Sequence, residues 1–141
     1  MGRRVFISGP IQGKETQQSY RATIRQICVR YGFEPIDPWE REKTLYGGTQ
    51  QGWWKNVSED SFIRRDLQDI GKCDLLVAYL PKLSAGTCME LFYAKIKGKK
   101  TICICEIENP SPWLTYHSDI IIRCIEELEY VLERDSDAGS K

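Results

Sequence analysis

The chain has 141 residues, of which 41% are hydrophobic, 11% aromatic and 28% charged, a composition that predicts one globular domain with a sizeable apolar core. Twenty basic residues balance twenty acidic ones, which argues against binding of a nucleic-acid polymer through its phosphates. No apolar run approaches the ~20 residues of a membrane span, so a membrane protein is not expected either.

The six cysteines lie in apolar segments and form no Cys-x-x-Cys pair. We expect them to be small buried hydrophobic residues of a cytoplasmic protein, because free thiols persist in a reducing compartment. Zinc needs clustered ligands, and the chain has one histidine, so we expect no metal site. Cys103 and Cys105 share one face of an expected strand, where thiol exchange is disfavoured.

The first third of the chain predicts strand, helix, strand and loop. Residues 4–8 (RVFIS) form a short apolar run that Gly9 and Pro10 end. Apolar residues at spacings of three and four predict a helix over 16–31. Residues 33–37 (FEPID) predict an edge strand, because proline cannot donate to a ladder. Residues 38–57 hold three tryptophans and three glycines, and so long a loop is usually functional.

The rest of the chain continues the alternation. Residues 74–80 (DLLVAYL) are almost continuously apolar, which is typical of a central strand covered on both faces. In chain order we expect a helix over 58–70, a strand over 74–80, a helix over 86–96, a strand over 101–105, a strand over 120–122 and a helix over 125–132.

This pattern predicts an α/β fold: a single catalytic domain over 1–134, built on a five-stranded, mainly parallel, doubly wound sheet with helices on both faces. Residues 135–141 (DSDAGSK) are expected to be a disordered polar tail. Ligands of such folds bind beyond the carboxyl ends of the strands. The loops 9–15, 38–57 and 81–87 should therefore meet at the binding site.

One strand-to-helix turn has the features of an anion site. Gly86 allows a ligand to approach the backbone, and the first amides of the following helix favour negative charge. The alternative is an ordinary turn capped by Ser84 or Thr87. Glu90 stands one turn further on, and Asp66 lies in the preceding helix; each alone is most simply a solvated or ion-paired carboxylate. Two converging carboxylates, however, suit glycosyl transfer.

Four motifs together carry a family resemblance. They are VFISGPI at 5–11, Asp66 followed by CDLLVA at 73–78, S-x-G-T-x-x-E-L-x-x-A at 84–94, and GKK at 98–100. In this order and spacing, over about residues 4–105, the chain resembles the nucleoside 2-deoxyribosyltransferase-like superfamily. The resemblance implies that Glu90 is the nucleophile at the anomeric carbon. It implies that Asp66 positions the base or handles its proton.

Position 84 discriminates within that superfamily. The deoxyribosyltransferases usually carry an aspartate six positions before the nucleophile, where it holds the sugar 5′-hydroxyl, and the branch that hydrolyses nucleoside 5′-monophosphates carries serine. A carboxylate would repel a phosphate, whereas the Ser84 hydroxyl and free amides accept one. We therefore expect an N-glycosidase that releases base and (deoxy)ribose 5-phosphate through a glycosyl-Glu90 intermediate, with no cofactor.

The remaining site residues follow from the anion-site argument and the resemblance. Trp53 and Trp54 are candidates for base stacking, although paired tryptophans more often pack within the domain or at an interface. The expected substrate-binding residues are Ser8, Gly9, Pro10, Ile11, Gln12, Asp37, Ser84, Gly86 and Thr87.

The resemblance also implies a homodimer or a larger homo-oligomer. In the monophosphate hydrolases a hydroxyl of the second subunit reaches the phosphate, and Thr115, His117 or Ser118 is the candidate here. The simpler interpretation of His117 is a surface or interface residue. Two other functions stay open: a transferase that exchanges bases, and a non-catalytic nucleotide-binding module. Both the base of the substrate and its sugar, ribose or 2′-deoxyribose, stay open as well.

Overall fold

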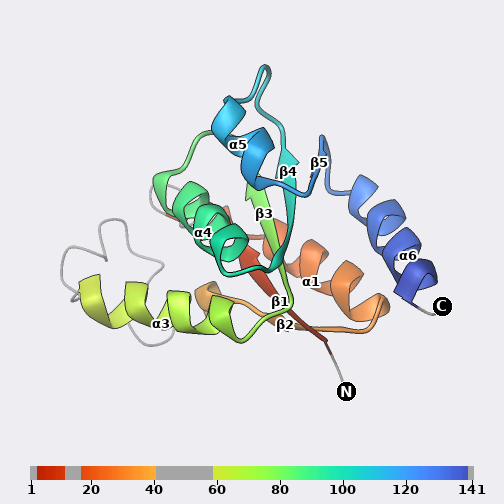
Figure 1. Ribbon diagram of the computed structural model, residues 1–141, viewed down its shortest axis with the longest axis horizontal. Coiled ribbons are helices and arrows are strands. Elements are labelled where there is room, and N and C mark those ends of the chain that lie inside the picture. Colours follow the sequence, from red (N-terminus) through yellow and green to blue (C-terminus); the bar gives the residue numbers. More distant parts are fainter. Residues whose placement is uncertain (1–2, 12–16, 41–58, 140–141) are drawn as a thin grey trace.

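The computed structural model describes residues 3–11, 17–40 and 59–139, which form a parallel β-sheet between two layers of helices (Figure 1). The sheet has five strands in the order β2-β1-β3-β4-β5, and every neighbouring pair is parallel. The strands are β1 (Arg3–Ser8), β2 (Phe33–Ile36), β3 (Leu75–Leu80), β4 (Lys100–Cys105) and β5 (Ile120–Ile122).

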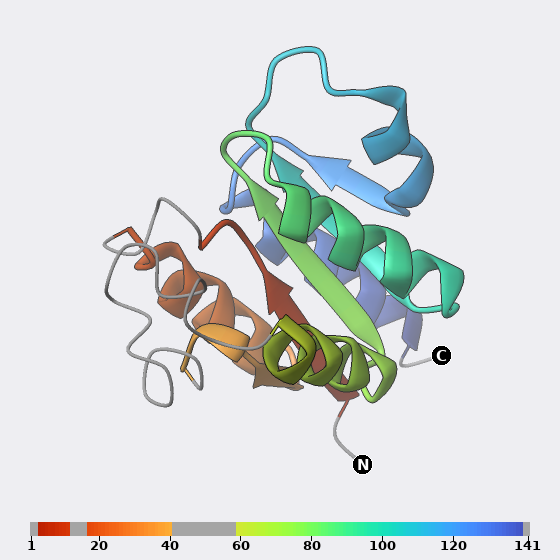
Figure 2. The same ribbon diagram turned by 90° about the vertical axis from the view of Figure 1, so that its left-hand side faces the viewer.

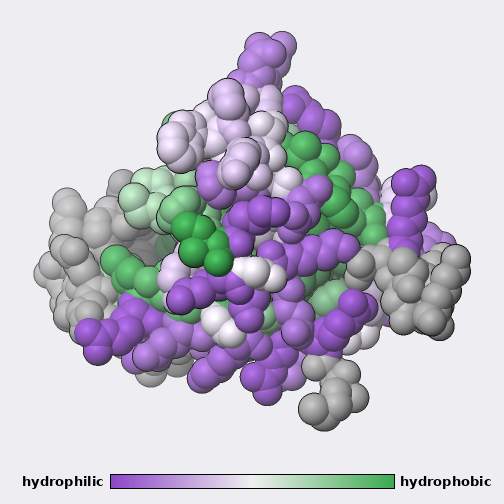
Figure 3. All heavy atoms as spheres, viewed as in Figure 1, coloured by the Kyte–Doolittle hydropathy of each residue, from purple (hydrophilic) through white to green (hydrophobic). Residues whose placement is uncertain are grey.

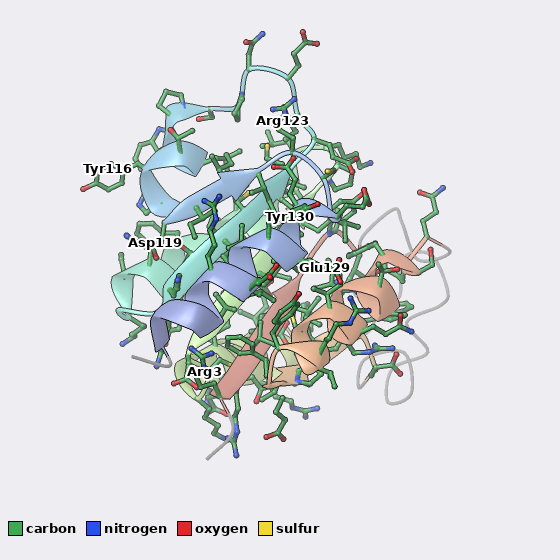
Figure 4. The ribbon with its side chains drawn as sticks, turned by 90° about the vertical axis from the view of Figure 1, so that its right-hand side faces the viewer. Arg3, Tyr116, Asp119, Arg123, Glu129 and Tyr130 are labelled. Atoms are coloured by element: carbon green, nitrogen blue, oxygen red, sulfur yellow. The ribbon has the colours of Figure 1, made fainter. Side chains whose placement is uncertain are left out.

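The helices divide between the two faces of the sheet, as Figures 1 and 2 show from two directions. One face carries α1 (Tyr20–Arg30) and α6 (Glu127–Gly139), and the other carries α3 (Glu59–Gly71), α4 (Ala85–Ile96) and α5 (Pro112–His117). In Figure 4, α6 runs beside α1, where Glu129 forms an ion pair with Arg30.

Strand β3 explains why the sheet needs both layers. Leu75 and Val77 belong to the core beneath α1 and α6, whereas Leu76, Ala78 and Leu80 belong to the core beneath α3 and α4. Successive strand residues point to opposite faces, so a continuous apolar run buries both. The prediction of a central strand at this segment is confirmed.

The strand order places the switch point between β1 and β3. Connections turn to opposite sides of the sheet there, and the space beyond the two strands' carboxyl ends is left open for a ligand. The predicted doubly wound parallel fold is confirmed. Strand β2 lies at the sheet edge, as Pro35 predicted, and pairs there with β1.

Three local expectations differ from the structure. Helix α1 begins at Tyr20, later than the expected residue 16. Helix α5 replaces an expected loop: Ser111 accepts a hydrogen bond from the Trp113 N–H, and proline occupies the first turn. Helix α6 continues to Gly139, so residues 135–139 are helical where a disordered tail was expected. Its last buried leucine is Leu132.

The state of the cysteines and the lengths of the helices can also be compared with the sequence predictions. All six cysteines are free, and four of them are buried. Among the described residues no helix has the length and apolar content to cross a bilayer.

Candidate active site

A cavity of about 280 Å³ lies beyond the carboxyl ends of β1 and β3, at the switch point. It draws on the β1–α1 turn, helix α3, the β3–α4 turn and the start of α4. Its lining residues are Gly9, Pro10, Ile11, Arg21, Pro38, Phe62, Asp66, Lys82, Leu83, Ser84, Ala85, Gly86, Thr87 and Glu90. The loops expected to meet thus meet here as far as they are described, while residues 12–16 and 41–58 lie outside the described residues.

The rim formed by the β3–α4 turn is polar and open. Ser84 is the N-cap of α4, and its Oγ lies 3.1 Å from the Thr87 Oγ1. A side chain at Gly86 would meet no atom within 4 Å, so a glycine here leaves free space over the backbone. The first amides of α4 and their positive dipole end favour an anion at this rim.

Glu90 is half-buried on α4 and faces the same cavity. The Ser8 hydroxyl donates a hydrogen bond of 2.5 Å to its Oε1. Burial and the nearby Asp66 carboxylate raise the pKa of Glu90 to about 8, although the Ser8 hydrogen bond and the Arg21 charge lower it. A carboxyl with such a pKa exchanges its proton near neutral pH, as acid, base and nucleophilic groups of enzymes do.

Asp66 reaches the cavity from a different element. It lies on α3 and is 8% exposed. It lines the same cavity as the start of α4. Asp66 and Glu90 line the same cavity, and the Asp66 charge raises the pKa of Glu90. Two carboxyl groups in one cavity are the arrangement that glycosyl transfer uses for a nucleophile and a proton-handling partner.

The β1–α1 turn forms the opposite wall. Pro10 is held through its carbonyl, which accepts hydrogen bonds from the Gln18 Nε2 at 2.9 Å and the Tyr20 hydroxyl at 3.3 Å. Gly9 and Ile11 line the cavity beside it, whereas the Ser8 side chain is engaged with Glu90. Gln12, another expected contact, lies outside the described residues, as do Trp53 and Trp54.

Asp37 was expected to contact the substrate, but the structure does not bring it to the cavity. Its side chain is 3% exposed and accepts hydrogen bonds from Arg21 at 2.8 Å and Arg25 at 2.9 Å. The carboxylate also accepts the Trp39 N–H at 3.1 Å. These partners hold Asp37 beneath the β1–α1 wall.

The residues expected to serve a second subunit lie away from this cavity. Each binds a carbonyl of its own segment: Thr115 Oγ1 donates to Pro112, and Ser118 Oγ donates to Leu114. The His117 Nδ1 lies 2.7 Å from the Trp113 carbonyl oxygen. A contact made across a subunit boundary therefore stays a prediction.

Six lining residues were not among the expected site residues: Arg21, Pro38, Phe62, Lys82, Leu83 and Ala85. A signal existed for Arg21, because it falls on the apolar stripe of α1 with Ile24 and Cys28, where a charge is out of place. Lys82 directly precedes the anion-site turn. Because lysines are common on protein surfaces, its position in the sequence does not by itself predict a site residue.

The described residues offer no group of three or more His, Cys, Asp or Glu side chains placed to hold a metal ion. The polar groups that line the cavity are the side chains of Glu90, Asp66, Arg21, Lys82, Ser84 and Thr87.

The family model described as nucleoside 2-deoxyribosyltransferase matches residues 5–134. The chain therefore belongs to the nucleoside 2-deoxyribosyltransferase family, which confirms the resemblance seen in the sequence. No curated protein matches the chain.

Solved structures show the same fold at low identity. A 2-deoxyribosyltransferase from Bacillus psychrosaccharolyticus is 17% identical with a TM-score of 0.70, and the match covers 89% of this chain and 90% of that one. The Clostridium botulinum CMP N-glycosidase BcmB is 23% identical with a TM-score of 0.60, covering 93% and 98%. A CheY-like receiver domain from Methanospirillum hungatei also matches, at 14% identity and a TM-score of 0.60, covering 99% and 98%. The fold alone thus leaves the activity open.

Proposed function

We propose that the protein hydrolyses the N-glycosidic bond of a nucleoside 5′-monophosphate, with Glu90 as nucleophile. The observation that carries the proposal is the shared cavity of Glu90, Asp66 and the first turn of α4. An anion-binding rim one turn from a nucleophilic carboxyl matches the layout of a sugar 5′-phosphate, whose phosphate lies a few bonds from C1′.

The rim favours a phosphate over a free hydroxyl. Ser84, whose Oγ accepts the Thr87 N–H, and Thr87 bring hydroxyl groups to this rim, Gly86 leaves free space over the backbone, and Lys82 adds a positive charge. Positive charge and free amides stabilise a phosphate dianion. The CMP N-glycosidase among the structural neighbours supports this class of substrate by analogy.

The reaction proceeds in two displacements at C1′. A Glu90 carboxylate oxygen forms a bond to C1′ while the C1′–N bond breaks, and its electron pair leaves with the base, which takes up a proton from Asp66 or solvent. Water then attacks C1′, Glu90 leaves as a carboxylate, and the water gives up its proton. The net products are free base and the sugar 5-phosphate, with retention at C1′.

A base-exchanging transferase is the second candidate. The deoxyribosyltransferase neighbour favours it, and both reactions share the first displacement. They differ in whether water or a second base accepts the glycosyl group.

Base release separates the two functions. The protein is incubated with ribo- and deoxyribonucleoside 5′-monophosphates and the matching nucleosides, with and without a second free base. Free base from monophosphates alone supports the hydrolase. A new nucleoside formed only with the second base supports the transferase, and no product from any substrate argues for a binding module. Glu90→Gln is the control, and normal turnover by it would rule out the mechanism.

We further propose that the protein forms a homodimer through α4 and α5. We place it in the cytoplasm, because free thiols persist in a reducing compartment. Met89, Phe92 and Ile96 form an exposed apolar stripe on α4, and Trp113 and Tyr116 are exposed on α5. Figure 3 shows green and near-white side chains gathered over these helices. An apolar groove of about 400 Å³ lies between them. Its residue Leu83 also lines the catalytic cavity, so a second subunit seated there would adjoin the active site.

A further inference from the structure

Arg21 is a buried guanidinium at the edge of the catalytic cavity. Only 1% of the residue is exposed, yet it is among the lining residues. A buried arginine is retained only when its donors and its charge are satisfied. The proposed reaction gives it no role, so its partners must show what it does.

The guanidinium holds the backbone on both sides of Ser8. Its Nη1 donates to the Ile7 carbonyl oxygen at 3.2 Å, and its Nη2 donates to the Gly9 carbonyl oxygen at 3.0 Å. Its Nε donates to the Gln18 Oε1 at 2.7 Å. A rigid planar fork can reach several acceptors at once, which the single ammonium of lysine cannot reproduce.

Ser8 is the residue between those two carbonyls, and its hydroxyl binds the nucleophilic carboxyl. It is 1% exposed, and the 2.5 Å hydrogen bond from its Oγ ends on Glu90 Oε1. Holding the carbonyl groups of the residues before and after Ser8 restricts the backbone between them, and with it the point from which the Ser8 side chain begins. The position of the Ser8 hydroxyl therefore depends on Arg21.

Arg21 is itself anchored from the far side. Its Nη1 donates to Asp37 Oδ1 at 2.8 Å, and Arg25 holds the other oxygen of that carboxylate at 2.9 Å. The hydrogen bonds thus run from Arg25 through Asp37 and Arg21 to the carbonyl groups on either side of Ser8, and the Ser8 hydroxyl continues them to Glu90. Such networks of charge-assisted hydrogen bonds fix geometry as well as charge.

We propose that Arg21 is a positioning residue for Glu90, which it orients by holding both carbonyl groups that flank Ser8. The proposal rests on the proposed role of Glu90 as the nucleophile. Electrostatics act in the same direction, because the Arg21 charge lowers the pKa of Glu90 and so favours the ionised, nucleophilic form.

The first test reads Glu90 directly and needs no turnover. The protein is labelled with ¹³C at the glutamate side-chain carboxyls, and the Glu90 signal, assigned by its loss in Glu90→Gln, is titrated. The groups acting on Glu90 are Ser8 from β1, Arg21 from α1 and Asp66 from α3, and the Glu90 charge in turn contributes to the raised pKa of Tyr20 on α1.

Arg21→Lys keeps the charge but loses the fork, and we expect it to raise the Glu90 midpoint. We expect the same direction for Ser8→Ala, because the Ser8 hydrogen bond lowers the pKa of Glu90. Arg30→Lys is the matched control, because Arg30 lies on the same helix but pairs with Glu129 of α6 and not with β1 or Asp37, and we expect the wild-type midpoint. A folded Arg21→Lys protein with the wild-type midpoint overturns the proposal. Arg21→Met, of similar length, decides in the same way if the lysine variant does not fold.

The second test asks whether Arg21 acts through Ser8. In the wild-type background Arg21→Lys should lower kcat for base release by about 10²-fold, as misplacement of a reacting group does. In the Ser8→Ala background the same change should have little further effect. An equal loss in both backgrounds overturns the proposal. If no substrate releases base, the proposed function fails, while the carboxyl titration still decides the role of Arg21.

Discussion

The ring of Tyr20 occupies the space in which a side chain at Gly9 would begin. A Cβ built on Gly9 would overlap the phenol oxygen and two ring carbons of Tyr20. The ring is also fixed from behind, because it packs against Tyr79 with a centroid distance of 4.5 Å. The absence of a side chain at Gly9 thus allows the Tyr20 ring of α1 to pack against the cavity wall.

Gly9→Ala should therefore destabilise the protein and weaken substrate binding. Overpacking in a fixed environment costs roughly 1–3 kcal/mol, and displacement of the Tyr20 ring moves the wall that Pro10 forms. Urea unfolding and KM for the monophosphate measure the two effects. Gly71→Ala is the control, because a Cβ there meets nothing within 4 Å. Equal stability of the two variants would contradict this explanation.

Glu90→Gln should stabilise the protein more at high pH than at low pH. The pKa of Glu90 is about 8 in the folded protein against an ordinary 4.5, so between these values the folded state retains a proton that the unfolded chain has released. The free energy of unfolding therefore falls as the pH rises between these two pKa values. Above the higher value, the buried ionised carboxyl destabilises the folded protein most.

Replacement by glutamine removes that cost. We expect a gain of roughly 1–3 kcal/mol near pH 9 and little gain near pH 4, relative to the wild type. Chemical denaturation of both proteins at the two pH values measures the difference. A gain that is the same at both values would show that Glu90 ionises normally.

The fold was largely predictable because its strongest signals are local. The run 74–80 is apolar throughout since β3 is covered on both faces, and Pro35 marks the edge position of β2. Helix α5 was missed because its six residues are too few to show a period, and Ser111 and Pro112 resemble loop residues.

The candidate site was predictable only in part. Ser84, Gly86 and Glu90 lie within one segment, so their proximity follows from helix geometry. Convergence of Asp66 from another helix was expected from the family resemblance alone. The pairing of Asp37 with Arg21 and Arg25 depends on tertiary contacts that no local pattern encodes, so the sequence could not predict it.

Asp66→Asn should lower activity and also shift its pH dependence. The Asp66 charge raises the pKa of Glu90, so its removal allows Glu90 to ionise at lower pH. We expect the acidic limb of kcat/KM to move down by about one pH unit, while kcat falls by roughly 10²-fold through loss of the proton-handling partner. The pH profile of base release measures both effects.

Asp69→Asn is the control for that change, because Asp69 lies on the same helix but does not line the cavity. It should leave the limb in place. A limb that stays in place in Asp66→Asn as well would mean that the two carboxyl groups do not interact in the working enzyme.

Lys82→Gln should weaken recognition of the phosphate specifically. Lys82 is exposed at the anion-binding rim, where an ion pair with phosphate in partial contact with water is worth about 1 kcal/mol. We expect KM for the monophosphate to rise about five- to tenfold, with no change for the nucleoside and a weaker dependence on salt. Lys97→Gln, at the far end of α4, is the control. A parallel rise for both substrates would exclude a phosphate contact.

Met89→Glu should convert the proposed dimer to a monomer. Met89 is 71% exposed in one chain and lines the apolar groove between α4 and α5, so a buried carboxylate there would go unpaired on association. Tyr130→Glu is the matched control: Tyr130 is 68% exposed, but it lies on α6 on the opposite side of the sheet (Figure 4). Sedimentation equilibrium should give a dimer for the wild type and Tyr130→Glu, and a monomer for Met89→Glu. Base release should fall in the Met89→Glu monomer if the second subunit completes the site beside Leu83. A dimeric Met89→Glu protein would place the interface elsewhere on the surface.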